Sequence, residues 1–118
     1  MNDADTTIES LRQAMRAFVA ERQWEKYHTP KNLAMSLAIE AAELMEHFQW
    51  LEPAESHATA DSPQSKAEIA DELADVLCYA LSLANVLQID VSNAVLGKLA
   101  KNALKYPAEH FRGRYRAD

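Results

Sequence analysis

The stretch that decides the fold is residues 29–46, TPKNLAMSLAIEAAELME. Thr29 can cap a helix that begins at Pro30, because a proline in the first turn needs no partner for a backbone N–H. At about 100° per residue, one side of this helix carries an apolar stripe roughly 60° wide. We therefore predict an amphipathic helix that runs from Pro30 to about Trp50. Its stripe is formed by Leu33, Leu37, Leu44, Phe48 and Leu51.

Two glutamates interrupt this apolar stripe. Glu40 lies inside the stripe and Glu43 lies at its edge, whereas Glu46 points further away. An ionised carboxylate among apolar side chains is costly unless a cation or several hydrogen-bond donors meet it. Glu40 is therefore the residue whose partner must be sought elsewhere in the chain.

A second acidic pair, Glu72 and Asp75, lies on the following long helix. Residues three apart are neighbours on a helix surface, so each pair can converge on one ion. If the two helices pack antiparallel, Glu40 and Glu43 face this second pair. Neither helix face places a Lys or Arg among the four acids. Unpaired carboxylates would repel one another and raise their own pKa values, and a hard divalent cation is the simplest resolution.

The type of ligand narrows the choice of metal. All four candidates are carboxylates, which favours Mg²⁺, with Mn²⁺ as a substitute, over zinc or copper. A ferritin-like di-iron bundle would need Glu-x-x-His pairs, but His47 follows Glu43 by four residues. Magnesium completes its shell with substrate phosphates, so the implied chemistry is phosphoanhydride hydrolysis. The alternative for either acidic pair taken alone is a solvated helix face.

Composition favours a single all-α domain over residues 1–118, with its core at about 8–107. Apolar residues make up 48% of the chain, and two glycines leave little turn chemistry for β-hairpins. We expect residues 53–63 to form a loop. The tail, residues 108–118, shows no periodicity, and we expect it to be a flexible, extended arm.

Local signals predict three further helices besides the one that begins at Pro30. The first helix opens with a capping box formed by Thr6 and Glu9. The third begins at Ser62 or Ser65, and the fourth is capped by Asp90. The last two are expected to end at about Leu87 and at Pro107.

The net charge of −6 argues against nucleic acid as the main partner, because phosphate backbones are bound by basic surfaces. No apolar run reaches the roughly 20 residues of a membrane span, so no membrane partner is expected. The first seven residues are polar and acidic, and Cys78 has no second cysteine to pair with. We therefore expect a cytoplasmic protein.

Several motifs of this chain resemble those of a known family. EAAELME at residues 40–46, followed by ELAD at 72–75, resembles the paired acidic motif of the MazG-like all-α nucleoside triphosphate pyrophosphohydrolases. The resemblance covers residues 8–107 and extends to the dCTP pyrophosphatase branch of that family. The motifs similar to that branch are WEKYHTPKNL at 24–33, FQW at 48–50 and KLAKNALKYP at 98–107.

The resemblance implies a four-helix bundle with magnesium at the two acidic pairs. It also implies that a nucleoside triphosphate, dCTP or a 5-substituted pyrimidine nucleotide, is hydrolysed to the monophosphate and pyrophosphate. The family forms homo-oligomers, commonly dimers or tetramers. The third helix favours the same conclusion, because surplus apolar surface tends to be buried against a second copy. The residues off its main stripe are Leu77, Leu81 and Ala84.

In that branch aromatic residues hold the base, which carries over to Trp24, Trp50 and Tyr79 of this chain. One departure is Met15, which stands where relatives carry a histidine near the base. Four polar residues are expected around the nucleotide. His28 and Asn32 lie near Trp24 in sequence and can reach the edge of the base. Lys98 and Asn102, together with His28, match family positions near the sugar or phosphates.

The catalytic roles expected at such a site fall to two residues. Glu43 would orient or deprotonate the attacking water, and Lys98 would offset charge on the pyrophosphate leaving group. Two alternatives remain open. A non-catalytic helical interaction module would explain the amphipathic helices but not Glu40. A metal-dependent phosphohydrolase acting on monophosphates would share the carboxylates but release orthophosphate.

Overall fold

The computed structural model describes residues 1–116, and all the regular structure within that range is helical. The all-α prediction is therefore confirmed. The chain divides into two compact units, residues 1–88 and residues 89–118. The assignment of residues 1–118 to a single domain stays a prediction.

The first unit begins with α1 (Ile8–Glu21). Its cap is Thr7, whose side chain accepts a hydrogen bond from the backbone N–H of Ser10 at 3.1 Å. The predicted capping box at Thr6 is wrong, because the Glu9 side chain turns along the helix to pair with Arg16. A short 3₁₀ turn, η1 (Glu25–Tyr27), follows.

Helix α2 (Pro30–Glu46) begins as predicted. Thr29 accepts a hydrogen bond from the backbone N–H of Asn32 at 3.1 Å, and Pro30 occupies the first turn. The helix ends earlier than the predicted Trp50, because the backbone tightens after Glu46 and the N–H of His47 bonds to the carbonyl of Leu44.

The predicted loop after α2 is wrong over most of its length. A short helix, α3 (Pro53–Ala58), forms there, and the 3₁₀ turn η2 (Thr59–Asp61) follows it. Glu52 and Glu55 form a reciprocal capping box at the start of α3, with Pro53 in the first turn. These two signals are sufficient to begin a helix that is too short to show an apolar period.

Helix α4 (Pro63–Leu87) is the longest element of the first unit. Ser62 caps its start by accepting a hydrogen bond from the backbone N–H of Ser65 at 3.4 Å. Its last turn closes on Gln88, which adopts the left-handed conformation with φ 55°. The choice of Ser62 over Ser65 as the cap settles one of the alternatives left by the sequence.

The second unit contains α5 (Val91–Lys105) and α6 (Ala108–Phe111). Asp90 caps α5 as predicted, accepting a hydrogen bond from the N–H of Asn93 at 2.8 Å. The expected extended arm is wrong at residues 108–111, where α6 forms and Phe111 packs edge-on against Tyr106 at 5.2 Å between ring centroids. Residues 117–118 of that predicted tail lie outside the described residues.

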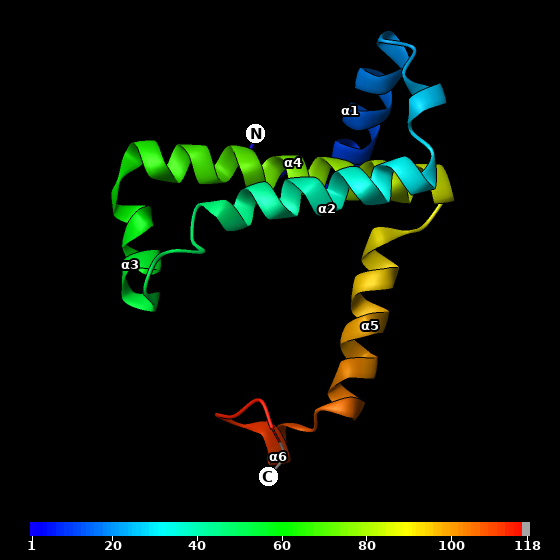
Figure 1. The fold of residues 1–118 in the computed structure, drawn as a ribbon. Helices are drawn as coiled ribbons and strands as arrows, with labels where there is room; N and C mark the ends of the chain where they lie inside the picture. The colour runs from blue at the N-terminus through cyan, green and yellow to red at the C-terminus, as the bar shows by residue number, and fades with distance from the viewer. Residues whose placement is uncertain (117–118) are drawn as a thin grey trace. The chain divides into compact units, whose positions relative to one another are not determined.

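Helices α2 and α4 of the first unit lie side by side and run in opposite directions, as the acidic pairs required (Figure 1). Helix α1 contacts α4 as well. The most buried side chain is Leu33 of the predicted α2 stripe, which is 1% exposed. Ala84, expected to be surplus apolar surface, is buried instead, whereas Leu77 is 53% exposed. Within residues 1–116, no single helix is long and apolar enough to cross a membrane; α4 and α5 reach that measure only when counted together, by length and composition.

Candidate active site

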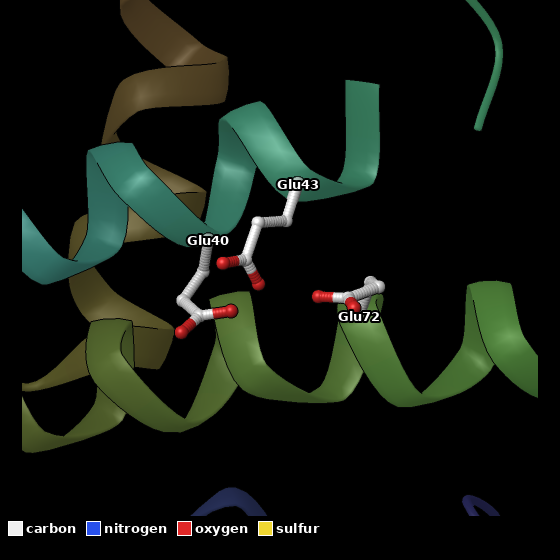
Figure 2. Close-up of side chains that lie close together, drawn as sticks. All are labelled: Glu40, Glu43 and Glu72. Carbon is white, nitrogen blue, oxygen red and sulfur yellow. The ribbon is translucent and has the colours of Figure 1, made fainter. Parts of the chain in front are cut away.

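Three of the four predicted metal ligands converge across the α2–α4 interface. Glu40 and Glu43 extend from α2 towards Glu72 of α4 (Figure 2). One carboxylate oxygen from each of the three residues lies within 4.8 Å of the other two. The three-residue spacing on α2 and the antiparallel packing of α4 produce this arrangement. It is a set of oxygen ligands suited to a hard divalent cation.

Two oxygens of this cluster are buried without a partner. Oε2 of Glu40 and Oε2 of Glu72 make no hydrogen bond, and both residues are half-buried. Glu43 is the exposed member of the three. Leaving carboxylate oxygens desolvated and unpaired costs free energy that a bound cation would recover. The donor chemistry and these orphaned oxygens therefore fit a divalent metal.

The electrostatics of the cluster show the same strain. Burial raises the pKa of Glu40 above its ordinary value, and a hydrogen bond and the charge of Glu43 raise it further. The pKa of Glu72 is raised by burial first and then by the charge of Glu43. The charge of His47 acts in the opposite direction on Glu72. These are the shifts expected of acids crowded together without a cation.

The fourth predicted ligand, Asp75, lies at the edge of the cluster. It follows Glu72 by three residues on α4 and is exposed. Its charge raises the pKa of both Glu40 and Glu72, which places it electrostatically within the site. Its oxygens are not among the three that converge. The assignment of Asp75 as a ligand therefore stays a prediction.

Within residues 1–116, no ion pair joins a lysine or arginine to these acids. The ion pairs found within residues 1–116 join Arg16 to Glu9 and Arg22 to Glu21, and neither involves the cluster. Oε2 of Glu40 and Oε2 of Glu72 likewise have no hydrogen-bond partner. The arrangement can therefore hold a cation, and through that cation it can hold an anionic ligand such as a polyphosphate.

A pocket of about 330 Å³ lies between α1 and the C-terminal half of α4. Its volume lies in the range of small-molecule sites, and its walls are mainly apolar with a few polar groups. Two of the residues singled out in the sequence, Met15 and His28, lie on its wall. Its lining residues are Met15, Arg16, Val19, Ala20, Glu25, His28, Ser82, Asn85 and Val86.

The predicted aromatic residues do not line this pocket. Trp24 packs edge-on against Phe18 at 5.9 Å between ring centroids, and the guanidinium of Arg22 lies 3.7 Å from the centroid of Phe18. Trp50 follows α2 and is 87% exposed. Tyr79 is half-buried on α4. The role of these three aromatic residues in holding a base stays a prediction.

The remaining predicted residues are distributed over both units. The side-chain amide of Asn32 donates to the backbone carbonyl of Tyr27 at 3.1 Å, which fixes the turn between η1 and α2. Lys98 and Asn102 both belong to α5 in the second unit, where Lys98 is exposed and Asn102 half-buried. Their proposed contacts with a nucleotide stay predictions.

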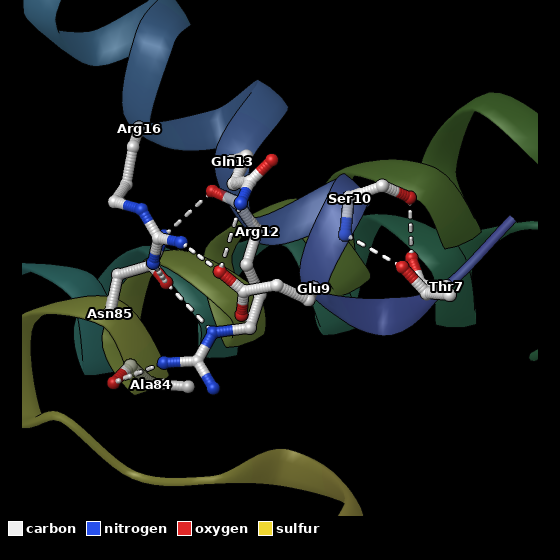
Figure 3. A network of polar contacts seen from close by, with 8 residues as sticks. All are labelled: Thr7, Glu9, Ser10, Arg12, Gln13, Arg16, Ala84 and Asn85. Carbon is white, nitrogen blue, oxygen red and sulfur yellow. Dashed lines mark hydrogen bonds and ion pairs between the residues drawn. The ribbon is translucent and has the colours of Figure 1, made fainter.

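A polar network beside the pocket was missed by the sequence analysis. Oδ1 of Asn85 accepts hydrogen bonds from Nε of Arg12 at 2.9 Å and from Nη1 of Arg16 at 2.7 Å, and the Asn85 amide donates to the backbone carbonyl of Arg12 at 3.1 Å (Figure 3). Arg12 also donates to the carbonyl of Ala84. The one available signal was a polar pair, Ser82 and Asn85, in the apolar C-terminal half of α4.

Comparison with known proteins places this arrangement in a family. The chain is 39% identical to dCTP pyrophosphatase 1 of Rattus norvegicus over 92% of its length, and 40% identical to dCTP pyrophosphatase 1 of Homo sapiens over 88%. It spans 64% and 61% of the length of these two relatives.

A solved structure is similar over almost the whole fold. A pyrophosphatase from Archaeoglobus fulgidus DSM 4304 matches 91% of this chain and 98% of its own, with a TM-score of 0.80 and 42% sequence identity. The MazG-like family model matches residues 35–116, which include both acidic pairs. The resemblance drawn from the motifs is confirmed, and the chain belongs to the MazG-like family.

Proposed function

We propose that this chain is a magnesium-dependent nucleoside triphosphate pyrophosphatase, which hydrolyses its substrate to the monophosphate and pyrophosphate. The observation that carries the proposal is the convergence of Glu40, Glu43 and Glu72, with two buried carboxylate oxygens that have no partner. Similarity to proteins named dCTP pyrophosphatase and pyrophosphatase supports the same reaction.

The residues proposed to hold magnesium are Glu40, Glu43, Glu72 and Asp75, with manganese as a substitute. When bound there, the ion supplies positive charge for the triphosphate oxygens and acidifies water. Glu40 and Glu72 are half-buried, which suits residues that fix a ligand set. Asp75 contributes negative charge from the next turn of α4.

Glu43 is proposed to act on the attacking water. It is the exposed member of the three converging carboxylates, so water can reach it while Glu40 and Glu72 remain half-buried. A carboxylate in that position can orient a water molecule or accept its proton as the oxygen attacks phosphorus. Lys98 is proposed to offset the charge that develops on the departing pyrophosphate.

The proposed substrate is dCTP or a modified pyrimidine nucleotide, whose removal would clear unwanted nucleotides from the pool. The pocket between α1 and α4 supports a place for the base, because His28 and Met15 both line it. Trp24, Trp50 and Tyr79 are proposed to stack on the base. Asn32 is proposed to contact the edge of the base, and Asn102 the sugar or phosphates.

We also propose that the protein forms a homo-oligomer, a dimer or a tetramer. Several large apolar side chains of α2 and α4 are more than half exposed, and these are Met35, Ile39, Met45 and Leu77. Apolar surface of this kind on a small protein is commonly buried against a second copy. Light scattering at micromolar concentration tests the proposal, and a mass near that of the 13.2 kDa chain would contradict it.

The experiment that tests the reaction is product analysis. Wild-type protein is incubated with dCTP, dUTP, dATP and dGTP in the presence of magnesium, and the products are separated by chromatography. We expect equal amounts of the monophosphate and pyrophosphate, with a pyrimidine preferred. Release of orthophosphate would contradict the reaction, whereas a purine preference would contradict only the substrate.

A further inference from the structure

Ser82 is the one polar residue of the α1–α4 pocket that is both deeply buried and unpartnered within residues 1–116. It is 4% exposed, and its hydroxyl makes no hydrogen bond. A buried hydroxyl normally finds a partner, because leaving one unmade costs the desolvation of that group. The hydroxyl of Ser82 therefore either destabilises the fold or forms a hydrogen bond with a ligand that enters the pocket.

The side chain of Asn85 cannot satisfy this hydroxyl. Asn85 lies three residues further along α4, on the same wall of the pocket. Its side-chain oxygen has two lone pairs, and Arg12 and Arg16 already occupy them. The side-chain network in Figure 3 therefore offers Ser82 no acceptor, and its unpartnered hydroxyl, which lines the pocket, is open to a ligand there.

The walls of the pocket define the kind of ligand. Met15, Val19, Ala20 and Val86 provide apolar surface suited to the faces of a flat ring. The Ser82 hydroxyl needs an acceptor at the edge of that ring, such as a carbonyl oxygen or a ring nitrogen. Serine turns its hydroxyl about a single torsion, so a change of rotamer can redirect the O–H within the pocket. A nucleobase combines these properties.

The distance along α4 from the acidic residues to Ser82 also suits a nucleotide that spans both sites. Ser82 follows Asp75 by about two helical turns, or roughly 10 Å along the axis, on the same element that carries Glu72. A triphosphate held at the carboxylates would thus leave its base within reach of the pocket. This step rests on the function proposed above.

We infer that Ser82 is a specificity-determining residue, whose hydroxyl donates a hydrogen bond to an acceptor on the edge of the nucleobase in the α1–α4 pocket. Asn85 and Arg16 line the pocket beside it and are hydrogen-bonded to each other. The inference assigns to Ser82 a role in recognising the base and none in the chemical step.

The test compares Ser82→Ala with Ser36→Ala, a half-buried serine of α2 that does not line the pocket. Two probes are titrated calorimetrically: dCMP, which carries the base without the triphosphate, and inorganic tripolyphosphate with magnesium, which carries no base. We expect Ser82→Ala to weaken dCMP binding about three- to tenfold, the range for one net hydrogen bond, and to leave tripolyphosphate binding unchanged. Ser36→Ala should change neither.

A second readout separates recognition from packing. In the ligand-free protein, Ser82→Ala should melt at or above the wild-type temperature, because it removes an unsatisfied buried hydroxyl. Unchanged dCMP binding, an equal loss with both probes, or a lowered melting temperature would each overturn the inference. The binding assay does not depend on turnover, so it stays informative even if the wild-type protein releases no pyrophosphate.

Discussion

Helix α4 presents two contrasting polar regions, one against α2 and one against α1. Against α2, Glu72 meets Glu40 and Glu43, and two carboxylate oxygens are buried without a partner. Against α1, Asn85 joins Arg12 and Arg16 in a network in which its side-chain oxygen is fully used. The buried carboxylates of the first region lower the stability of the metal-free fold, whereas the hydrogen bonds of the second region hold α1 against α4.

The difference shows which buried polar groups stabilise the fold and which bind a ligand. In a closed network, such as that of Asn85, the hydrogen bonds are made within the chain, so removing one of its residues should mainly change stability. An open acidic cluster is satisfied from outside, so its neutralisation should abolish binding while the fold gains stability.

The largest effect is expected from Glu40→Gln. The amide keeps the shape of the side chain but removes a charged ligand, so pyrophosphate release should fall by at least about 100-fold, since even residues that only support metal ligands are worth 10- to 100-fold. Without metal, the variant should be at least as stable as the wild type. Steady-state turnover at saturating magnesium and urea unfolding without metal measure the two effects.

The matched control is Glu46→Gln, which changes the last residue of the same helix on an exposed position. It should retain turnover within about twofold, because a solvated carboxylate interacts weakly. Near wild-type turnover by Glu40→Gln would show that the cluster is not the metal centre.

In the closed region, Asn85→Ala is expected to destabilise the fold by about 2 kcal/mol, because it removes the oxygen that accepts from Nε of Arg12 and from Nη1 of Arg16. Urea unfolding measures the loss. Asn93→Ala, at an exposed asparagine of α5, is the control and should change stability little. A loss below about 0.5 kcal/mol for Asn85→Ala would mean that the network does not hold α1 to α4.

The stability of the metal-free protein should depend on pH through the acidic cluster. The folded state raises the pKa of Glu40 and Glu72 above the ordinary value of 4.5, so it binds protons more tightly than the unfolded state. Their contribution to the stability of the metal-free protein is therefore present at low pH and lost as pH rises through the raised pKa values. Relative to wild type, Glu40→Gln should gain stability over that interval. A constant difference between pH 4 and 8 would contradict the shifts.

The smallest effect is expected at the end of α4, outside both regions. Gln88 has a φ of 55°, a conformation that glycine adopts without strain. Gln88→Gly should raise the free energy of unfolding by about 0.5 kcal/mol without changing turnover. A loss of stability would indicate that the Gln88 side chain contributes contacts that outweigh the relieved strain.

Much of the open region could be predicted from the sequence. Thr29 and Pro30 marked the start of α2, and a helical wheel placed Glu40 on an apolar face where a carboxylate is out of place. Both signals are local, and the antiparallel packing of neighbouring long helices supplied the rest. The same reasoning missed α3, because six residues are too few to show a period.

The closed region could not be predicted in the same way. Arg12 and Asn85 are 73 residues apart, and the polar position of Asn85 on an apolar half of α4 does not indicate which residue pairs with it. Their pairing depends on how α1 packs against α4, which local patterns do not determine. The unpaired hydroxyl of Ser82 could not be predicted for the same reason, since it lies in a pocket that forms only where α1 packs against α4.

The central claim is that the facing carboxylates of α2 and α4 bind a divalent cation. Calorimetric titration of Mg²⁺ into nucleotide-free wild-type protein and Glu40→Gln, in two buffers of different ionisation enthalpy, tests it most directly. We expect saturable binding to the wild type, with protons released at mildly acidic pH because the raised pKa values of Glu40 and Glu72 let these groups hold protons above their ordinary titration range. The variant should lose both the binding and the proton release. Equal binding by the two proteins would contradict the account.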